Sequence, residues 1–419
     1  MQGEGLAQGK TLSSAGAERL PLFRQRGFLL MWAGKSLTGL ALFSFMTAQS
    51  WYVVRELQRD DWMGWVLMVM TIPRLLLFPW GGVLADRFPR ASMMSLSLFL
   101  RAFWIGAMLV TYGMGELHIA AVMIFSFGYG MLDTMFWPAS DSILPELVEK
   151  EQLTRANSLI FTTFQLTMVT GPFITGAILT HGSYVGVFSF VTFFLLAAGV
   201  VIRLLPKKET EKTEKMHSPL QDLREGVRYV RHTSYLFVFL WVTLVVNFFF
   251  AGPVNAGLPV WVDQVLKGNA LDLSYMEGSL GVGMVTGGLL VGWLNIRKKR
   301  AILLLGTVAL IGLSMAAWSQ ATVLWEGMVA LCLIGFWLSV GNVTGASLAQ
   351  ELIPKEKMGR VFSLNSTASY GLIPISHGLV SALLSLGVSL DGMLWYSGWL
   401  LTLYVAGMLW KVKVLRTLD

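Results

Sequence analysis

The sequence contains few charged residues for its length. Asp, Glu, Lys and Arg make up only 14% of the 419 residues, whereas 54% are hydrophobic and the mean hydropathy is +0.61. A soluble globular domain of this size does not combine so little charge with so much apolar surface. The composition therefore predicts an integral membrane protein.

Cysteine is nearly absent, since Cys332 is the only one, and it cannot form an intramolecular disulfide. The sequence also lacks a P-loop, zinc-ligand spacing and a nucleophile triad, and no polar stretch is long enough for an ATPase or catalytic domain. We therefore expect no enzyme activity, no cofactor and no metal.

Long apolar runs fill most of the chain. About twelve of them approach the roughly 20 residues that a helix needs to cross a bilayer. They begin near residues 28, 63, 91, 118, 156, 185, 235, 275, 301, 324, 361 and 393. The runs are apolar on every face, whereas a membrane β-barrel needs alternating segments. The sequence thus predicts an all-α membrane protein.

The net charge of +7 follows from an uneven distribution of basic residues. Of the 32 lysines and arginines, 26 lie on the predicted face that also carries both termini. Three lie on the opposite face: Arg55, Arg59 and Lys267. The other three lie within spans: Lys35, Arg74 and Arg101. The positive-inside rule places both termini in the cytoplasm, with the protein in the cell (inner or plasma) membrane. The basic residues thus indicate topology and contact with anionic lipid rather than nucleic acid.

A polar linker divides the chain into two repeats. We expect two helical bundles, at 28–205 and 235–412. The tail at 1–27, the linker at 206–234 and the tail at 413–419 are expected to be cytoplasmic. LPELVEKEQLTRANSL (144–159) aligns without gaps on AQELIPKEKMGRVFSL (349–364) with seven identities. Parallel repeats of six spans are a recognised transporter plan.

The stretch GGVLADRFPR (81–90) lies between the second and third predicted spans. It resembles the G-x-L-A-D-R-x-G-R loop signature of the major facilitator superfamily, with Pro89 replacing a glycine. The matching positions are Gly82, Leu84, Asp86, Arg87 and Arg90. The resemblance implies a fold of twelve transmembrane helices in two six-helix pseudo-symmetric bundles.

A second stretch, TGPFITGAIL, resembles the G-P-x-x-G-G signature of the superfamily's exporters through Gly171, Pro172 and Gly176. Thr175 replaces one glycine of this signature. Other segments, such as PRLLLFPWGGVLADR, are most similar to sequences of the branch that contains macrolide-efflux proteins and the enterobactin exporter.

The resemblance implies a cytoplasmic latch that closes one half against the other. Asp86 is expected near the start of span eleven, around Gly359 and Arg360, while Glu146 pairs with Arg90. A helix N-terminus attracts such a carboxylate. The alternative is a polar turn with topology-setting arginines. Gly292 and Trp293 stand where the second half would repeat Asp86 and Arg87, so we expect the latch charges in the first half alone.

Ionisable residues within a membrane span cost several kcal/mol unless they are paired or hydrated. Four such residues lie in the first half: Lys35, Arg74, Arg101 and Asp133. The corresponding positions in the second half are Leu240, Leu280, Gly306 and Leu338. Three cations against one anion give a net positive cavity, which favours an anionic or zwitterionic amphiphile over a purely cationic drug.

Asp133 has two interpretations that the sequence leaves open. It is either the group that carries a proton, with Pro138 allowing its helix to bend, or the anion of a permanent salt bridge to Arg101 or Arg74. Glu277 and Glu326, near span ends, are the less favoured carriers. Lys35 is expected to face the cavity rather than to extend towards the cytoplasm.

These observations predict a monomeric secondary transporter that exports a bulky amphiphilic compound, drug-like, siderophore-like or anionic, by alternating access. Without a nucleotide site, the energy is expected to come from protons. The alternatives are a lipid or lysolipid flippase on the same fold, and a membrane sensor or scaffold that transports nothing.

Overall fold

The computed structural model describes most of the chain. The described residues are 21–206, 227–294, 299–353, 361, 364, 365, 367 and 370–411, without the side chains of 78–87, 150, 234 and 409–411. Over these residues the structure is helical and contains no strand. The expected all-α class is therefore confirmed.

The helices of the first half follow the apolar runs, because only a helix satisfies its own backbone hydrogen bonds in lipid. They are α1 (Arg26–Trp51), α2 (Met63–Arg87), α3 (Arg90–Gly113), α4 (Ile119–Asp133), α5 (Phe136–Leu147), α6 (Leu153–His181) and α7 (Tyr184–Arg203).

The second half repeats this order. Its helices are α9 (Ser234–Ala251), α10 (Gly257–Gln264), α11 (Ala270–Leu294), α12 (Arg300–Trp318), α13 (Leu324–Leu352), α15 (Ile373–Ser385) and α16 (Leu390–Lys411). Among the described residues, eight helices are long and apolar enough to cross a membrane. The expected number of twelve spans is not confirmed and remains a prediction.

The same glycine contact recurs in both halves. A Cβ on Gly130 of α4 would lie 1.9 Å from the Met70 carbonyl oxygen of α2, and one on Gly335 of α13 would lie 2.1 Å from the Leu280 oxygen of α11. Only glycine permits backbones to approach so closely. Gly130 and Gly335 are 205 positions apart and their partners Met70 and Leu280 are 210 apart, so both halves use a repeat-related glycine for close packing, with the partner shifted by about one turn.

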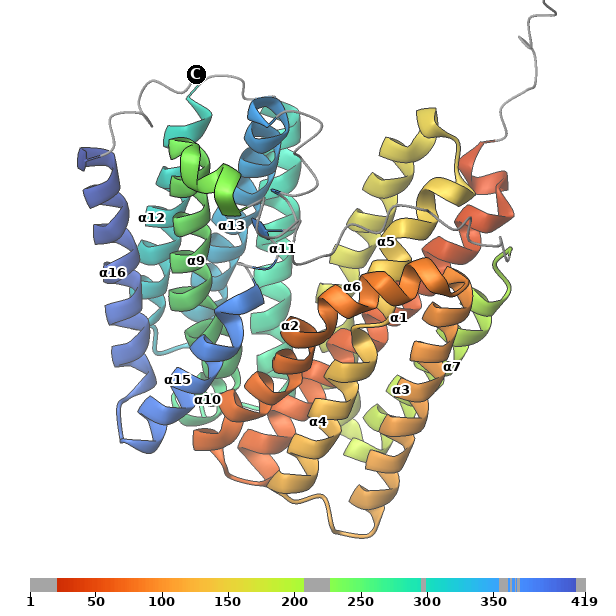
Figure 1. Ribbon diagram of the computed structural model, residues 1–419. Helices are drawn as coiled ribbons and strands as arrows, with labels where there is room; N and C mark the ends of the chain where they lie inside the picture. Colours follow the sequence, from red (N-terminus) through yellow and green to blue (C-terminus); the bar gives the residue numbers. More distant parts are fainter. Residues whose placement is uncertain are drawn as a thin grey trace, which may run out of the picture.

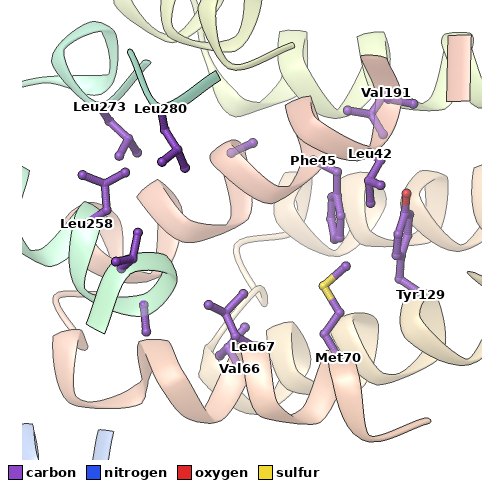
Figure 2. Close-up of a cluster of buried hydrophobic side chains, with 14 of the residues drawn as sticks. Leu42, Phe45, Val66, Leu67, Met70, Tyr129, Val191, Leu258, Leu273 and Leu280 are labelled. Atoms are coloured by element: carbon purple, nitrogen blue, oxygen red, sulfur yellow. The ribbon is translucent and has the colours of Figure 1, made fainter. Parts of the chain in front are cut away.

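The two halves meet at one end of the molecule and separate at the other (Figure 1). We call the end where α1 begins and α16 ends the terminal end, and the opposite end the far end. Helix α2 packs on α15, and α6 packs on α11. Figure 2 shows Leu258, Leu273 and Leu280 of the second half beside helices of the first, and all three belong to one hydrophobic cluster that includes both halves. Contacts between the halves therefore close the far end, whereas their helices separate towards the terminal end (Figure 1).

Candidate functional site

Asp133 lies where the fourth expected span is broken. Helix α4 ends at Asp133 and α5 begins at Phe136, with Thr134 and Met135 forming a turn between them. Pro138 occupies the first turn of α5, where the amide that it lacks would have no helical partner. The break thus places the carboxylate at a helix C-terminus, which is unfavourable for an anion without nearby cations.

Two arginines supply those cations. Arg101 Nη1 donates to Asp133 Oδ1 at 2.6 Å, and Arg74 Nη2 donates to Oδ2. Trp137 Nε1 also donates to Oδ2, at 2.9 Å. The Arg101 side chain has no exposed surface, and that of Asp133 is 4% exposed. Two guanidinium groups stabilise the ionised carboxylate, and the three side chains tie α2, α3 and α4 together.

Lys35 lies beside an acid that the sequence interpretation missed. Its Nζ is 3.5 Å from Asp141 Oδ1 of α5, and the Asp141 side chain is 71% exposed. The Trp137 ring lies between two cations, 5.6 Å from Lys35 Nζ and 5.9 Å from the Arg74 guanidinium carbon. Such contacts stabilise a cation through the ring quadrupole. We refer to Lys35, Arg74, Arg101, Asp133 and Asp141 as the charge cluster.

Asp141 changes the expected charge balance, because the charge cluster holds three cations and two anions. In the sequence, Asp141 lies near the end of its span, so only one anion, Asp133, is expected there. The excess of one positive charge weakens the argument against a cationic substrate. An exposed carboxylate at Asp141 is also available to an ammonium group.

The second half contains a cavity of about 460 Å³ between α9, α12 and α13, which is also lined by Val361, Leu364, Asn365, Tyr370 and Ile373. Leu240 and Leu338, which correspond to Lys35 and Asp133 in the repeat, are among its lining residues. None of the described lining residues is charged, and Asn247 and Asn342 provide amide groups. Tyr370 lines this cavity, and its ring lies 5.8 Å from the Arg74 guanidinium carbon.

The expected latch is described only in part. Arg90 forms an ion pair with Glu146, and its Nη1 also donates to the Ser142 carbonyl oxygen at 2.9 Å. The structure therefore brings these two predicted residues together. The side chains of the other predicted latch residues lie outside the described residues: Gly82, Asp86, Arg87, Gly359 and Arg360.

The second half has the same ion pair, contrary to the expectation that only the first half keeps the charges of this device. Arg300 pairs with Glu351, and its Nη1 donates to Ser347 Oγ at 3.3 Å. Glu351 and Ser347 follow Glu146 and Ser142 by 205 positions. Gly292 and Trp293 do not reveal this pair, because its arginine, Arg300, begins the next helix.

The three expected exporter-motif residues lie on α6, which packs on α1 of its own half and on α11 of the other half. Gly171 packs on α1, where its carbonyl oxygen accepts a 3.0 Å hydrogen bond from Ser44 Oγ. A Cβ on Gly176 would lie 2.2 Å from Ser274 Oγ of α11, and this hydroxyl donates to the Pro172 carbonyl oxygen at 2.7 Å. The motif therefore permits close packing of α6 within its own half and across to the other.

Polar contacts also join the two halves at the far end. Arg55 Nη1 lies 2.9 Å from Asp263 Oδ1, and Gln264 Nε2 donates to Asp60 Oδ2 at 2.6 Å. Burial raises the pKa of Asp60, and the nearby carboxylates of Asp263 and Asp61 add to this effect, although the bond from Gln264 opposes it. Closure of the far end therefore favours the protonated form of Asp60.

The fold and site define a multi-pass membrane transporter with two related halves that pack together at one end. The chain belongs to the major facilitator superfamily, whose family model matches residues 31–377. It is 24% identical to macrolide efflux protein A from Streptococcus pyogenes over 398 residues, which are 94% of this chain and 97% of that protein. The resemblance to the macrolide-efflux branch is thus confirmed, and the protein is a membrane efflux transporter.

Solved structures agree on the fold. The human organic anion transporter MFSD10 superposes with a TM-score of 0.65 at 15% identity, covering 93% of this chain and 99% of that one. A mutant of the peptide transporter POT superposes with a TM-score of 0.75 at 11% identity, covering 95% of this chain and 97% of that one.

Proposed function

We propose that the protein is a proton-coupled exporter of a bulky amphiphilic compound in the cell membrane, with both termini in the cytoplasm. The observation that supports this function best is the difference between the two halves. The first half carries the charge cluster, and the second carries an uncharged cavity at repeat-related positions. A molecule with a charged group and a large apolar surface matches both.

Arg74 and Tyr370 are proposed to connect the two subsites. Their contact joins the halves directly, so a substrate that binds there touches both. Macrolide efflux protein A, a relative over nearly the whole chain, makes a macrolide the first compound to test. A macrolide has a large apolar ring and an amine, and the exposed carboxylate of Asp141 is able to bind that amine.

The observed closure of one end supports alternating access. With the termini in the cytoplasm, the structure represents an inward-open state, closed at its far end. The Arg90–Glu146 and Arg300–Glu351 pairs each lie within one half. We propose that these pairs hold the loops after α2 and α11 in place, ready to close the terminal end when the far end opens.

Of the two interpretations of Asp133, the geometry favours the salt bridge. The carboxylate is bound to both arginines rather than to one of them, and neutralising it would leave two buried cations without a counter-ion. Asp133 is therefore proposed to hold the charge cluster together, and the proton that drives export binds elsewhere.

Flux measurements in proteoliposomes test this function. A radiolabelled macrolide should accumulate against its gradient when a pH gradient is imposed and should not when the gradient is collapsed. Leu338→Trp, which fills the cavity, should abolish accumulation. The matched variant Leu333→Trp places the same ring on the outer face of the same helix, where Leu333 is 43% exposed, and should keep it.

The same vesicles separate the alternatives. Movement of a fluorescent lysophospholipid but not of the macrolide would favour a flippase. Absence of any gradient-driven movement of either compound would contradict the proposed function.

A further inference from the structure

Thr47 and Glu277 form a hydrogen bond that joins the two halves. The Oγ1 of Thr47, on α1, lies 2.5 Å from Glu277 Oε2, on α11. Thr47 is 1% exposed. This contact lies one helical turn from the Ser274 bond to Pro172 and therefore belongs to the closed far end.

The hydroxyl proton of Thr47 has two possible acceptors. Thr47 Oγ1 also lies 3.0 Å from the Phe43 carbonyl oxygen, one turn earlier on α1. A hydroxyl has one proton and can donate to one of these oxygens only. If Thr47 donates to Phe43, as buried helical threonines do, a protonated Glu277 donates to Thr47 and both protons are used. If Glu277 is ionised, it draws the hydroxyl proton away from Phe43.

No cation compensates an ionised Glu277. Among the described residues, no lysine, arginine or histidine forms an ion pair with it. The ionisable groups on α11 and on the helices packed against it are Asp272 and Tyr275 on α11, Arg26 and Lys35 on α1, Arg155 and His181 on α6, Asp263 on α10, and Glu326, Cys332 and Glu351 on α13.

Most of these groups are engaged elsewhere. Lys35 pairs with Asp141, and twelve residues separate it from Thr47 along α1, roughly 18 Å at the helical rise. Asp263 pairs with Arg55, and Glu326 accepts a hydrogen bond from the Thr322 amide. Burying a carboxylate without a cation is costly, so the closed far end requires the neutral form of Glu277.

We infer that Glu277 is the proton-binding site that controls closure of the far end. This inference rests on the proposed function, and it names the residue that binds the proton which drives export. With the far end open, Glu277 binds a proton from the outer solution, and the neutral acid permits closure on Thr47. Release of this proton to the cytoplasmic side leaves a carboxylate that the closed interface does not stabilise, so the far end opens again.

The control of closure can be tested without any substrate. In a Cys332→Ser background, spin labels at Met114→Cys and Gln320→Cys mark the far ends of α3 and α12, one in each half and both at exposed positions. The distance between the labels should be short at acid pH and should lengthen as pH rises. Glu277→Gln imitates the neutral acid and should keep the short distance throughout.

Two further variants address the hydrogen bond. Thr47→Val removes the acceptor and should move the pH of opening downward, whereas Thr47→Ser should leave it unchanged. They also keep the inference testable if Glu277→Gln fails to fold. Asp60 titrates on the same interface, so Asp60→Asn must retain the transition. An unchanged transition in folded Glu277→Gln would overturn the inference, as would an unchanged transition in Thr47→Val if Glu277→Gln fails to fold.

Transport separates this inference from the function on which it rests. If the wild type accumulates the macrolide under a pH gradient, Glu277→Gln should reduce accumulation to the level without a gradient, and the matched Glu326→Gln should keep it. If Glu277→Gln accumulates normally, Glu277 is not the carrier. If the wild type fails to respond to the gradient while its label distance still changes with pH, the proposed function fails and the proton-controlled closure stands.

Discussion

Gly64 determines how closely the two halves approach at the far end. It lies in the first turn of α2 against α15, and a Cβ added there would lie 2.0 Å from the His377 carbonyl oxygen and 2.8 Å from Ser381 Oγ. The next residue, Trp65, donates its amide to Ser381 Oγ at 3.1 Å. Gly64→Ala is therefore expected to oppose closure of the far end.

The size of the effect follows from the distance. Ordinary contact begins near 3.4 Å, so the oxygen and the new methyl group must separate by about 1.4 Å from their 2.0 Å starting distance. Inserting a methyl group into a packed interface costs about 1–3 kcal/mol. Because the clash exists only while the far end is closed, the ratio of closed to open molecules should fall by about 5- to 150-fold.

The assay is the distance distribution between spin labels at Met114→Cys and Gln320→Cys, measured at acid pH. The matched control is Gly130→Ala, whose Cβ would lie 1.9 Å from the Met70 carbonyl oxygen within the first half. This control should lower the melting temperature in detergent without favouring the open far end. An unchanged distance distribution in folded Gly64→Ala protein would refute the reasoning, because two helices in this contact cannot both keep their positions.

The remaining predictions concern the charges and the topology. Asp133→Asn should lower stability by about 3–5 kcal/mol, since it leaves two buried arginines unpaired; adding Arg101→Leu should recover part of the loss, and thermal unfolding in detergent measures both. The melting temperature of Asp60→Asn should rise relative to that of the wild type as pH increases from acid to neutral. The raised pKa of Asp60 in the closed form means that the protonated side chain stabilises the wild type at low pH, and this stabilisation is lost as Asp60 ionises. A difference that stays constant with pH would contradict this. Thr213→Cys in the Cys332→Ser background should resist a membrane-impermeant thiol reagent applied to intact cells, and labelling would reverse the proposed topology.

The fold was predictable because its determinants are local. Apolar runs of helical length and a repeat with an offset of 205 are visible in the chain, and they fix the helices and their duplication. The pairing of Arg90 with Glu146 was expected from a resemblance, and the structure places the two residues together. Pro138 indicated a bend in the span that contains Asp133, because a proline weakens the helical hydrogen bonds near it whatever the distant parts of the chain do.

The site was less predictable because it depends on contacts between distant helices. Asp141 looked like a residue at a span end, and only the packing of α5 on α1 brings it to Lys35. Glu277 lies 230 positions from Thr47, and no pattern in either segment indicates their contact. Asp133 itself was visible in the sequence as a mid-span acid, whereas its binding to two arginines at once was not.

The difference between the two halves supports the proposal that the proton and the substrate bind at different sites. The repeat preserves the parts that pack, such as Gly130 with Gly335 and the paired arginines at the starts of α3 and α12. It does not preserve the interior, where charges in one half face an uncharged cavity in the other. The Asp133 carboxylate is the shared counter-ion of two arginines, so its loss would leave both cations uncompensated. A carboxyl at the contact between the halves is different: its environment changes whenever the halves move, so binding of a proton and movement of the halves must affect each other to the same extent.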